Sequence, residues 1–233
     1  MEKTNKYIVF FCIIILINAS VDKTAIAQNI ESVIDQDGNN YKTIRIGTQT
    51  WMAENLRTTK YNDGTPIPLV TDKDAWIVLF TPAYCWYNND TIYKNAYGAL
   101  YNGYAVNTDK LCPYGWHVST DADWTKLIEI LGGENVAGGK LKELGTTYWK
   151  EPNSGATNES GFTALPGGSR YANGLFFTIN RIGYWWTFTG LKVINGWYRS
   201  MSSTNSSVRR NYIDLINGFS VRCVKDYETL LFN

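Results

Sequence analysis

The sequence predicts an α+β domain with antiparallel β-structure at both ends and two helices in the middle. Three observations lead to this expectation: a hairpin signal near residue 37, a helical spacing of apolar residues after Thr120, and glycine-separated strand-like runs after Trp149. No internal repeat and no long linker divides residues 28–233, so we expect them to form one folded domain.

The first 27 residues have the pattern of a secretory signal peptide. Lys3 and Lys6 precede an uncharged apolar run over residues 7–17, and the small-residue pattern Ala25-Ile26-Ala27 follows. This run is shorter than the roughly 20 residues that a membrane-spanning helix needs. We therefore predict cleavage before Gln28, location in the cell envelope or secretion (periplasmic or extracellular), and no stable membrane span after cleavage. An uncleaved membrane anchor is the alternative.

The charge balance of residues 28–233 argues against a nucleic-acid partner. Of the 22 basic and 21 acidic residues, three and two respectively lie within residues 1–27, which leaves 19 of each sign. Nucleic-acid-binding proteins usually carry a basic excess, because neutralising phosphates supplies much of their affinity. We expect no nucleic-acid partner.

Three cysteines remain after the predicted cleavage: Cys85, Cys112 and Cys223. Export to an oxidising compartment predicts one disulfide and one unpaired thiol. The chain has no CxxC motif, and His117 is its only histidine, so a zinc site of ordinary ligand type is not expected. We predict no metal and no cofactor.

The start of the domain predicts a β-hairpin. Asp35–Asn39 separates the strand-like runs Glu31–Ile34 and Tyr41–Ile46, and its Asp-Gly step is typical of a tight turn. A calcium-binding loop would need a glutamate at its twelfth position, and counted from Asp35 that position is Ile46. We interpret the segment as a turn.

The middle of the chain predicts two helices. The ring-rich region Trp76–Val106 is broken by glycine and asparagine, which favours short strands and loops there. Thr120 can then cap a helix, with Asp123 as its reciprocal partner. The apolar residues that share one face of this helix are Trp124, Leu127, Ile128 and Leu131. A glycine pair ends this helix, and a second is expected from about Val136 to Leu144.

Strand-like runs dominate the last third of the chain. They are Gly183–Thr189, Gly196–Met201, Ser207–Ile213 and Phe219–Val224. Each is short and bounded by glycine or polar residues, which is typical of antiparallel β-structure.

Several blocks form a recognisable layout: Tyr41–Leu56, Tyr97–Asn102, Leu111–Trp124, Gly138–Lys142, Gly155–Gly168, Gly183–Trp186 and Gly218–Val224. This layout resembles the Fibrobacter succinogenes major paralogous domain, a family of exported bacterial domains. The resemblance implies a C-type-lectin-like fold with a twisted antiparallel β core, two helices and long irregular loops. The blocks with a more distant similarity to formylglycine-generating enzymes are Trp116–Trp124, Pro166–Arg170 and Gly218–Arg222.

The resemblance also implies how the cysteines pair. In the implied fold the last strand returns close to the segment around the major helices. Cys112 precedes the first of these helices and Cys223 lies in the last strand, so we expect a Cys112–Cys223 disulfide that leaves Cys85 unpaired. Closing a loop of about 110 residues stabilises a fold by about 4–5 kcal/mol in the chain-entropy treatment.

No catalytic constellation is visible, so we predict that the protein is not an enzyme. The resemblance to formylglycine-generating enzymes implies a pair of reactive cysteines, but the C-terminal third contains only Cys223. His117 lies on a short apolar strand, where a histidine is typically structural and hydrogen-bonded. Glu151-Pro152-Asn153 matches a tripeptide that C-type lectins use for calcium and sugar. Glu159 is the only acidic residue between it and Asp214, so we interpret it as a loop.

Rings on the late strands are the best ligand-binding candidates. Neighbouring strand residues point to opposite faces, so on a one-sided sheet one ring of Trp185–Trp186 and one of Trp197–Tyr198 is open to a ligand. Arginines there could hydrogen-bond hydroxyls or carboxylates, and residues 88–90 form the best oxygen cluster upstream. The candidates are Trp186, Trp197, Tyr198, Arg199, Asn88 and Asp90, with Arg209 and Arg210 on a nearby strand.

The sequence therefore predicts a secreted or cell-surface, non-catalytic domain that binds a glycan or a surface protein. A surplus of tyrosine and tryptophan fits such a surface, because these rings combine apolar area with a polar end. The alternatives are an oxidase like the formylglycine-generating enzymes and a structural module of a surface assembly.

Overall fold

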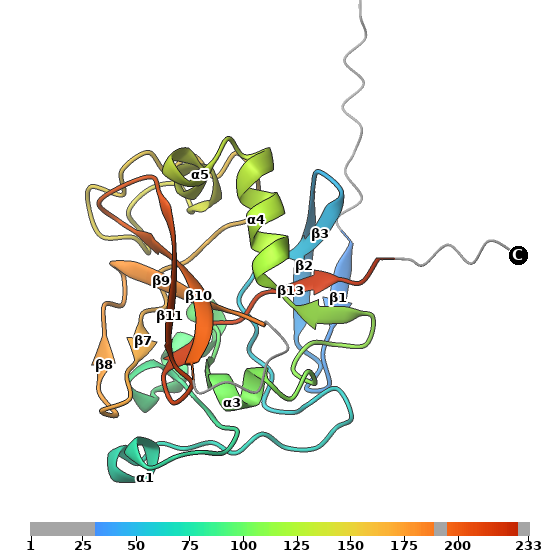
Figure 1. Cartoon of the computed structure of the whole chain (residues 1–233), viewed down its shortest axis with the longest axis vertical. Helices are drawn as coiled ribbons and strands as arrows, with labels where there is room; N and C mark the ends of the chain where they lie inside the picture. The colour runs from blue at the N-terminus through green and yellow to red at the C-terminus, as the bar shows by residue number, and fades with distance from the viewer. Residues whose placement is uncertain (1–30, 189–194, 228–233) are drawn as a thin grey trace, which may run out of the picture.

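The computed structural model describes residues 31–188 and 195–227, and the predicted signal peptide over residues 1–27 lies outside the described residues. The described chain is mostly β-structure, with three curled antiparallel sheets and a few short helices (Figure 1). This arrangement is compatible with the predicted α+β class.

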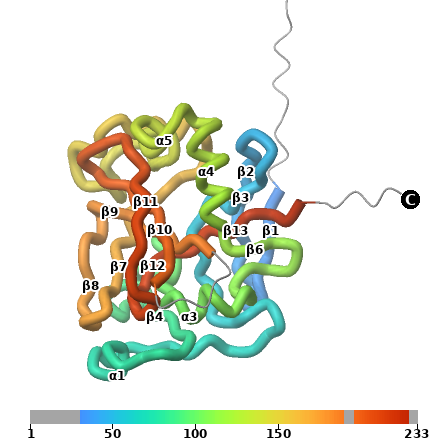
Figure 2. Tube along the Cα trace, in the orientation of Figure 1, coloured from blue at the N-terminus to red at the C-terminus, as the bar shows by residue number. Residues whose placement is uncertain are grey.

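The first sheet brings the two ends of the domain together. Its strands, in spatial order, are β1 (Ser32–Ile34), β2 (Asn40–Ile46), β3 (Gln49–Met52), β13 (Cys223–Lys225) and β6 (Trp116–Val118). Strands β1 and β2 form the predicted hairpin, and Asp35 holds its turn by accepting the Asp37 and Asn39 amides at 2.9 Å each. In Figure 2 the blue N-terminal strands and the red β13 meet on one side of the molecule.

The other two sheets are built mainly from the second half of the chain. The second contains β11 (Val208–Asp214), β10 (Asn195–Ser202) and β9 (Ile182–Thr187), in that order. The third contains β4 (Tyr84–Cys85), β5 (Leu100–Asn102), β12 (Gly218–Phe219), β7 (Ser169–Arg170) and β8 (Phe176–Phe177). The prediction of one strand over 219–224 is wrong, because the chain crosses from the third sheet to the first between β12 and β13.

The predicted helix after Thr120 is α4 (Asp121–Ile130), and its capping box is present. Thr120 Oγ1 accepts the Asp123 amide at 3.1 Å, and the Asp123 carboxylate accepts the Thr120 amide at 2.9 Å. The second helix, α5, runs over Glu134–Leu141 and so begins and ends earlier than predicted. It ends there because Lys142 adopts an extended backbone and directs its ammonium group into the interior.

The ring-rich region has no long helix, as predicted, but it contains short helices and 3₁₀ turns as well as the short strands expected there. Its helices are α1 (Lys73–Ile77), α2 (Lys94–Tyr97) and α3 (Gly103–Val106), and its 3₁₀ turns are η1 (Tyr87–Asn89) and η2 (Thr91–Tyr93). Asn102 shows how such short elements are held together. Its side-chain oxygen accepts the Ala83 and Ala105 amides at 3.0 Å each, which joins β5, the start of α3 and the segment before β4.

Apolar side chains cover both faces of the second sheet along β9. On one face Trp185 packs against Trp124 of α4, with ring centroids 6.0 Å apart. On the other face Trp186 and Tyr184 pack against Phe219 at 4.8 and 4.9 Å. Strand β9 is therefore buried on both of its faces.

The predicted disulfide is confirmed. Cys112 and Cys223 are bonded across 111 residues of sequence and join the segment before β6 to β13. Among the cysteines in the described part of the chain, Cys85 is left unpaired and is buried. The resemblance that implied this pairing was therefore informative about the path of the chain.

Buried cations satisfy the backbone carbonyls of the irregular loops. Arg222 is fully buried, donates to Asn55 Oδ1 at 2.8 Å, and donates to the carbonyls of Met52, Phe162 and Thr163 at 2.7–2.9 Å. Arg170 donates to four carbonyls in the 70–72 and 174 segments, again without a carboxylate partner in the described chain. These loops have few ladder hydrogen bonds, so the guanidinium groups supply the missing donors.

Replacing Arg222 with methionine tests this role. The Arg222→Met variant leaves three buried carbonyls without donors, so we expect the free energy of unfolding to fall by about 3 kcal/mol or more. Urea unfolding of the disulfide-intact protein measures the change. Arg45→Met is the matched control, since Arg45 is exposed and donates only to the nearby Gly47 carbonyl. Equal stability of the two variants would contradict the assignment.

Candidate functional site

The register of the second sheet aligns polar and aromatic side chains in rows across one face. Ser200 of β10 pairs with Tyr184 of β9 and with Arg209 of β11. The next row on the same face pairs Tyr198 with Trp186 and with Asn211. Because directly paired residues project to the same side, these rows form one continuous surface.

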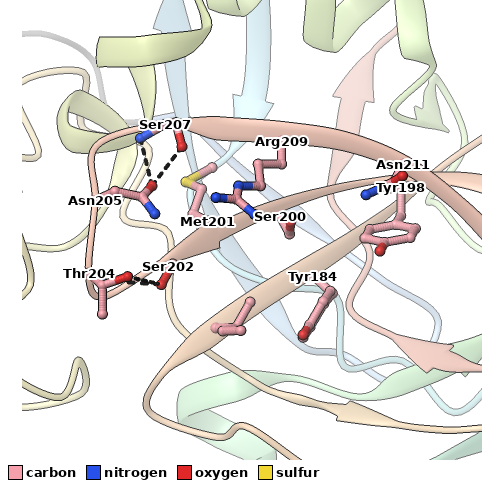
Figure 3. Close-up of a pocket in the computed structure, with 11 residues that line it drawn as sticks. Tyr184, Tyr198, Ser200, Met201, Ser202, Thr204, Asn205, Ser207, Arg209 and Asn211 are labelled. Atoms are coloured by element: carbon pink, nitrogen blue, oxygen red, sulfur yellow. Dashed lines mark hydrogen bonds between the residues drawn. The ribbon is translucent and has the colours of Figure 1, made fainter.

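This face carries a groove of about 270 Å³ that extends to the tip of the β10–β11 hairpin (Figure 3). The residues that line the groove are Ile182, Tyr184, Tyr198, Ser200, Met201, Ser202, Thr204, Asn205, Ser207, Arg209 and Asn211. Hydroxyl, amide and guanidinium groups therefore surround two tyrosine rings. Arg209 is the single charged residue of this lining.

The two tyrosines form the aromatic floor of the groove. The ring centroids of Tyr184 and Tyr198 lie 5.8 Å apart, and both rings pack on Phe219, at 4.9 and 5.0 Å. Burial raises the pKa of both phenols, so each is a neutral hydroxyl over the physiological range. Tyr198 is partly exposed and supplies ring surface and a hydroxyl that can donate or accept hydrogen bonds, whereas Tyr184 is only 7% exposed and supports the Tyr198 ring.

Short-range hydrogen bonds hold the tip of the hairpin. Asn205 Oδ1 accepts the amide of Ser207 at 3.0 Å and its hydroxyl at 2.6 Å (Figure 3). The Ser202 and Thr204 hydroxyl oxygens are 2.9 Å apart. Lys142 anchors the same tip from below, because its ammonium donates to the Ser202 and Asn205 carbonyls at 3.0 and 2.9 Å. The wall of the groove is thus fixed in place.

The opposite face of the hairpin carries a different cluster. Arg199 is buried there, and its guanidinium lies 2.8 Å from Asp121 and 3.6 Å from Glu134. Arg210 also contacts Asp121, at 2.9 Å, and stacks 3.7 Å from the centroid of Trp197. Trp197 in turn packs edge-on against Tyr212 at 5.4 Å. Ion pairs and stacking therefore occupy the arginines of this face.

Comparison with known proteins identifies the family. The model of the Fibrobacter succinogenes major domain matches residues 44–225, from within β2 to the end of β13. The chain belongs to the Fibrobacter succinogenes major domain family. No curated protein and no solved structure matches the chain. The resemblance predicted from the sequence blocks is confirmed, and in this Fibrobacter succinogenes major domain the groove lies wholly inside the matched region.

The structure separates the predicted ligand-binding residues. Tyr198 lies in the groove, whereas Trp197 lies on the opposite face and is only partly exposed. Asn88 and Asp90 are exposed at the η1 and η2 turns and do not line the groove. Asp90 there accepts the Ile92 amide at 2.9 Å, which caps the second turn. The candidates therefore do not form one site.

Two of the candidates are buried. The prediction that one ring of Trp185–Trp186 is exposed is wrong, since their exposed fractions are 0% and 1%. The sheet has apolar cover on both faces at β9, and Trp186 also donates its ring N–H to the Tyr101 carbonyl at 2.8 Å. Arg199 is likewise 1% exposed and contacts carboxylates, so it has no surface for a ligand in this structure.

The sequence interpretation missed most of the groove. Tyr184, Ser200 and Asn211 were not candidates, although Tyr198, Ser200 and Ser202 alternate along one strand. That alternation placed them on one face and could have suggested the hydroxyl-rich lining. The pairing of this face with Arg209 depends on the hairpin register and was not readable from a single strand.

His117 is hydrogen-bonded, as predicted, and lies between two carboxylates. Its Nδ1 is 2.6 Å from Asp226 Oδ1, and its Nε2 is 3.1 Å from Asp123 Oδ2. The hydrogen bond with Asp123 raises the pKa of His117, against the effect of burial, and Asp226 raises it further. Burial acts to raise the pKa of Asp123, but hydrogen bonds from His117 and Thr120 outweigh it and lower that pKa to about 2.

Other candidate chemistries find little support in the described chain. Residues 31–188 and 195–227 contain no cluster of three or more histidine, cysteine or acidic residues placed to hold a metal ion. Within the same ranges, no helix has the length and apolar character that crossing a bilayer requires. Asn153 of the Glu-Pro-Asn loop donates its side-chain amide to the Glu143 and Gly145 carbonyls, at 2.9 and 2.6 Å.

Removing the Lys142 ammonium tests whether it fixes the groove wall. In Lys142→Met the carbonyls of Ser202 and Asn205 lose their donor, so we expect the free energy of unfolding to fall by about 2–4 kcal/mol. We also expect faster hydrogen exchange at the Ser203 amide, which bonds to the Arg181 carbonyl beside the tip. The exposed Lys150→Met is the control. Unchanged exchange at Ser203 would contradict this role.

The contacts of His117 with Asp123 and Asp226 predict that the free energy of unfolding depends on pH. The pKa of His117 in the folded state lies above its unfolded value of about 6.5. The stabilisation from protonated His117 is therefore fully present below pH 6.5 and is lost as the pH rises through the folded-state pKa. The stability difference between wild type and His117→Gln should therefore shrink as the pH rises from 6 to 9. Urea unfolding across this range measures the change, and Asp109→Asn is the control, since Asp109 lines the same surface hollow as His117. A stability difference between wild type and His117→Gln that stays constant over this pH range would contradict the prediction.

Proposed function

We propose that this Fibrobacter succinogenes major domain is a secreted or cell-surface, non-catalytic binding domain whose ligand is a glycan held in the β9–β10–β11 groove. The single observation that carries the proposal is the lining of the groove. Two tyrosine rings form its floor, and hydroxyl, amide and guanidinium groups surround them. Sugars present both apolar ring faces and hydroxyls, and this lining offers partners for both.

A non-catalytic role is supported by the state of the reactive groups. Cys223 is bonded to Cys112, and burial raises the pKa of the Cys85 thiol to about 12. A reactive thiol needs an exposed, stabilised thiolate, and neither cysteine offers one. The His117 imidazole is held by two carboxylates and does not line the groove. These observations disfavour the alternative of an oxidase like the formylglycine-generating enzymes.

We also propose that the fold is C-type-lectin-like and that the protein is exported. The curled antiparallel sheets, the two helices α4 and α5 and the long loops support the first proposal. The basic start, the apolar run over 7–17 and the small residues before Gln28 support the second, together with the Cys112–Cys223 disulfide.

A protein ligand is the second candidate, and it is favoured by the cluster on the opposite face. Tyr212 is 61% exposed and packs on Trp197, and the Arg210 guanidinium also stacks on the Trp197 ring. Tryptophan, tyrosine and arginine are the residues most enriched at the energetic centres of protein interfaces. This face therefore has the composition of a protein-binding surface.

A glycan array with matched variants distinguishes the two faces. We expect the wild-type domain to bind at least one glycan and Tyr198→Ala to bind it about tenfold more weakly, because the floor of the groove loses a ring. Asn211→Ala, an exposed change in the same groove, should also weaken binding without a loss of stability.

Tyr212→Ala is the control for this experiment, since it removes a tyrosine from the opposite face and should leave glycan affinity unchanged. Thermal unfolding of every variant separates a lost contact from a lost fold. Absence of binding to any glycan by folded wild-type protein would overturn the proposal. Loss of binding in Tyr212→Ala alone would assign the glycan to the other face.

A further inference from the structure

The groove contains a positive charge, Arg209, for which the described residues provide no counter-charge. Arg209 projects from β11 onto the groove face, directly across from Ser200 (Figure 3). Within the described residues, no carboxylate oxygen lies within 4.0 Å of its guanidinium, and no acidic residue lines the groove. The guanidinium donors are therefore available for a bound molecule.

The neighbouring arginines differ in this respect. Arg210, next to it on the same strand, projects to the opposite face and forms an ion pair with Asp121. Arg199, which pairs with Arg210 across the two strands, forms ion pairs with Asp121 and Glu134. The acidic side chains near the hairpin thus neutralise the arginines of one face, while the groove face keeps its charge. This asymmetry makes the groove locally electropositive.

The surroundings of Arg209 suit a sugar that carries a carboxylate. Asn211 lies two residues further along the same face and offers an amide, and Ser200 offers a hydroxyl. The rings of Tyr198, one strand away on β10, and of Tyr184, two strands away on β9, lie on the same face. The raised pKa values of both phenols keep them uncharged, so neither competes for the guanidinium. A guanidinium matches the two oxygens of a carboxylate in a planar, paired geometry that hydroxyls do not reproduce.

We propose that the groove selects acidic glycans, and that Arg209 recognises the carboxylate of a uronic-acid residue while the partly exposed Tyr198, supported by the buried Tyr184, contacts its ring. This inference rests on the proposed glycan-binding function and narrows it to a ligand class. Arg209 is exposed to solvent, so the charge-assisted contact adds specificity and a moderate gain in affinity.

The test compares uronic-acid polymers with their carboxyl-reduced forms. Polygalacturonate and alginate are used as probes, each beside the neutral polymer obtained by reducing its carboxylates to primary alcohols, which preserves the linkage and the ring. Affinity electrophoresis of the full mature chain gives the dissociation constants. We expect the wild type to bind an acidic polymer about tenfold more tightly than its reduced form, and this preference to fall as salt rises from about 50 to about 500 mM.

Arg209→Gln and Arg45→Gln are the matched variants, because both remove one exposed arginine and Arg45 lies on β2, outside the groove. Arg209→Gln should lose the preference for the acidic polymer and keep the affinity for the reduced one, whereas Arg45→Gln should behave as wild type. Equal binding of acidic and reduced polymers by wild type, or equal losses in the two variants, would overturn the inference and leave the glycan-binding function standing. Absence of binding to every acidic and neutral polymer would overturn both.

Discussion

The rest of the structure depends on the hydrogen bonds that the buried guanidinium of Arg222 donates. This guanidinium lies where the chain leaves the third sheet and enters the first, and it donates to segments around residues 52–55 and 162–163. Asn55 Oδ1, one of its acceptors, also accepts the Trp185 ring N–H at 2.9 Å. One buried cation thereby connects the first sheet, a long loop and the strand that supports the groove. Burial lowers the pKa of Arg222 to about 9, so it stays cationic at neutral pH.

Buried cations also explain how a domain with such long loops provides hydrogen-bond donors for its backbone carbonyls. Peptide carbonyls outside regular structure lack ladder partners, and an orphaned buried carbonyl costs about 1–3 kcal/mol. Arg170 serves the loop around residues 70–72, and Lys142 serves the loop at 154 and the hairpin tip. A lysine offers three donors and an arginine five, whereas a serine offers one and an asparagine two. Several hydrogen bonds thereby fix each of these loops, and the loops can hold a binding surface in place.

Coverage of the second sheet decides where a ligand could bind. Its β9 edge is packed on both faces, by α4 on one side and by Phe219 on the other. Toward β11 this cover ends, and Arg209, Asn211 and Tyr212 are exposed. The same three strands thus supply both core and surface. Among the described residues, the groove face retains uncharged hydroxyls and the Arg209 cation without a carboxylate partner, while the opposite face neutralises its arginines with Asp121.

Local interactions and a specific family layout were readable from the sequence by itself. The first hairpin and the capped start of α4 follow from contacts within a few residues, namely the turn at Asp35 and the pair Thr120–Asp123. The tertiary structure alone decided which strand residues are exposed, because burial of Trp186 depends on Phe219, which lies far along the chain. It also decided that Arg209 faces the groove and has no carboxylate partner in the described part of the chain, since strand register determines the first property and the positions of distant carboxylates determine the second. Alternation along a strand separates two faces, but only long-range packing determines what covers each of them.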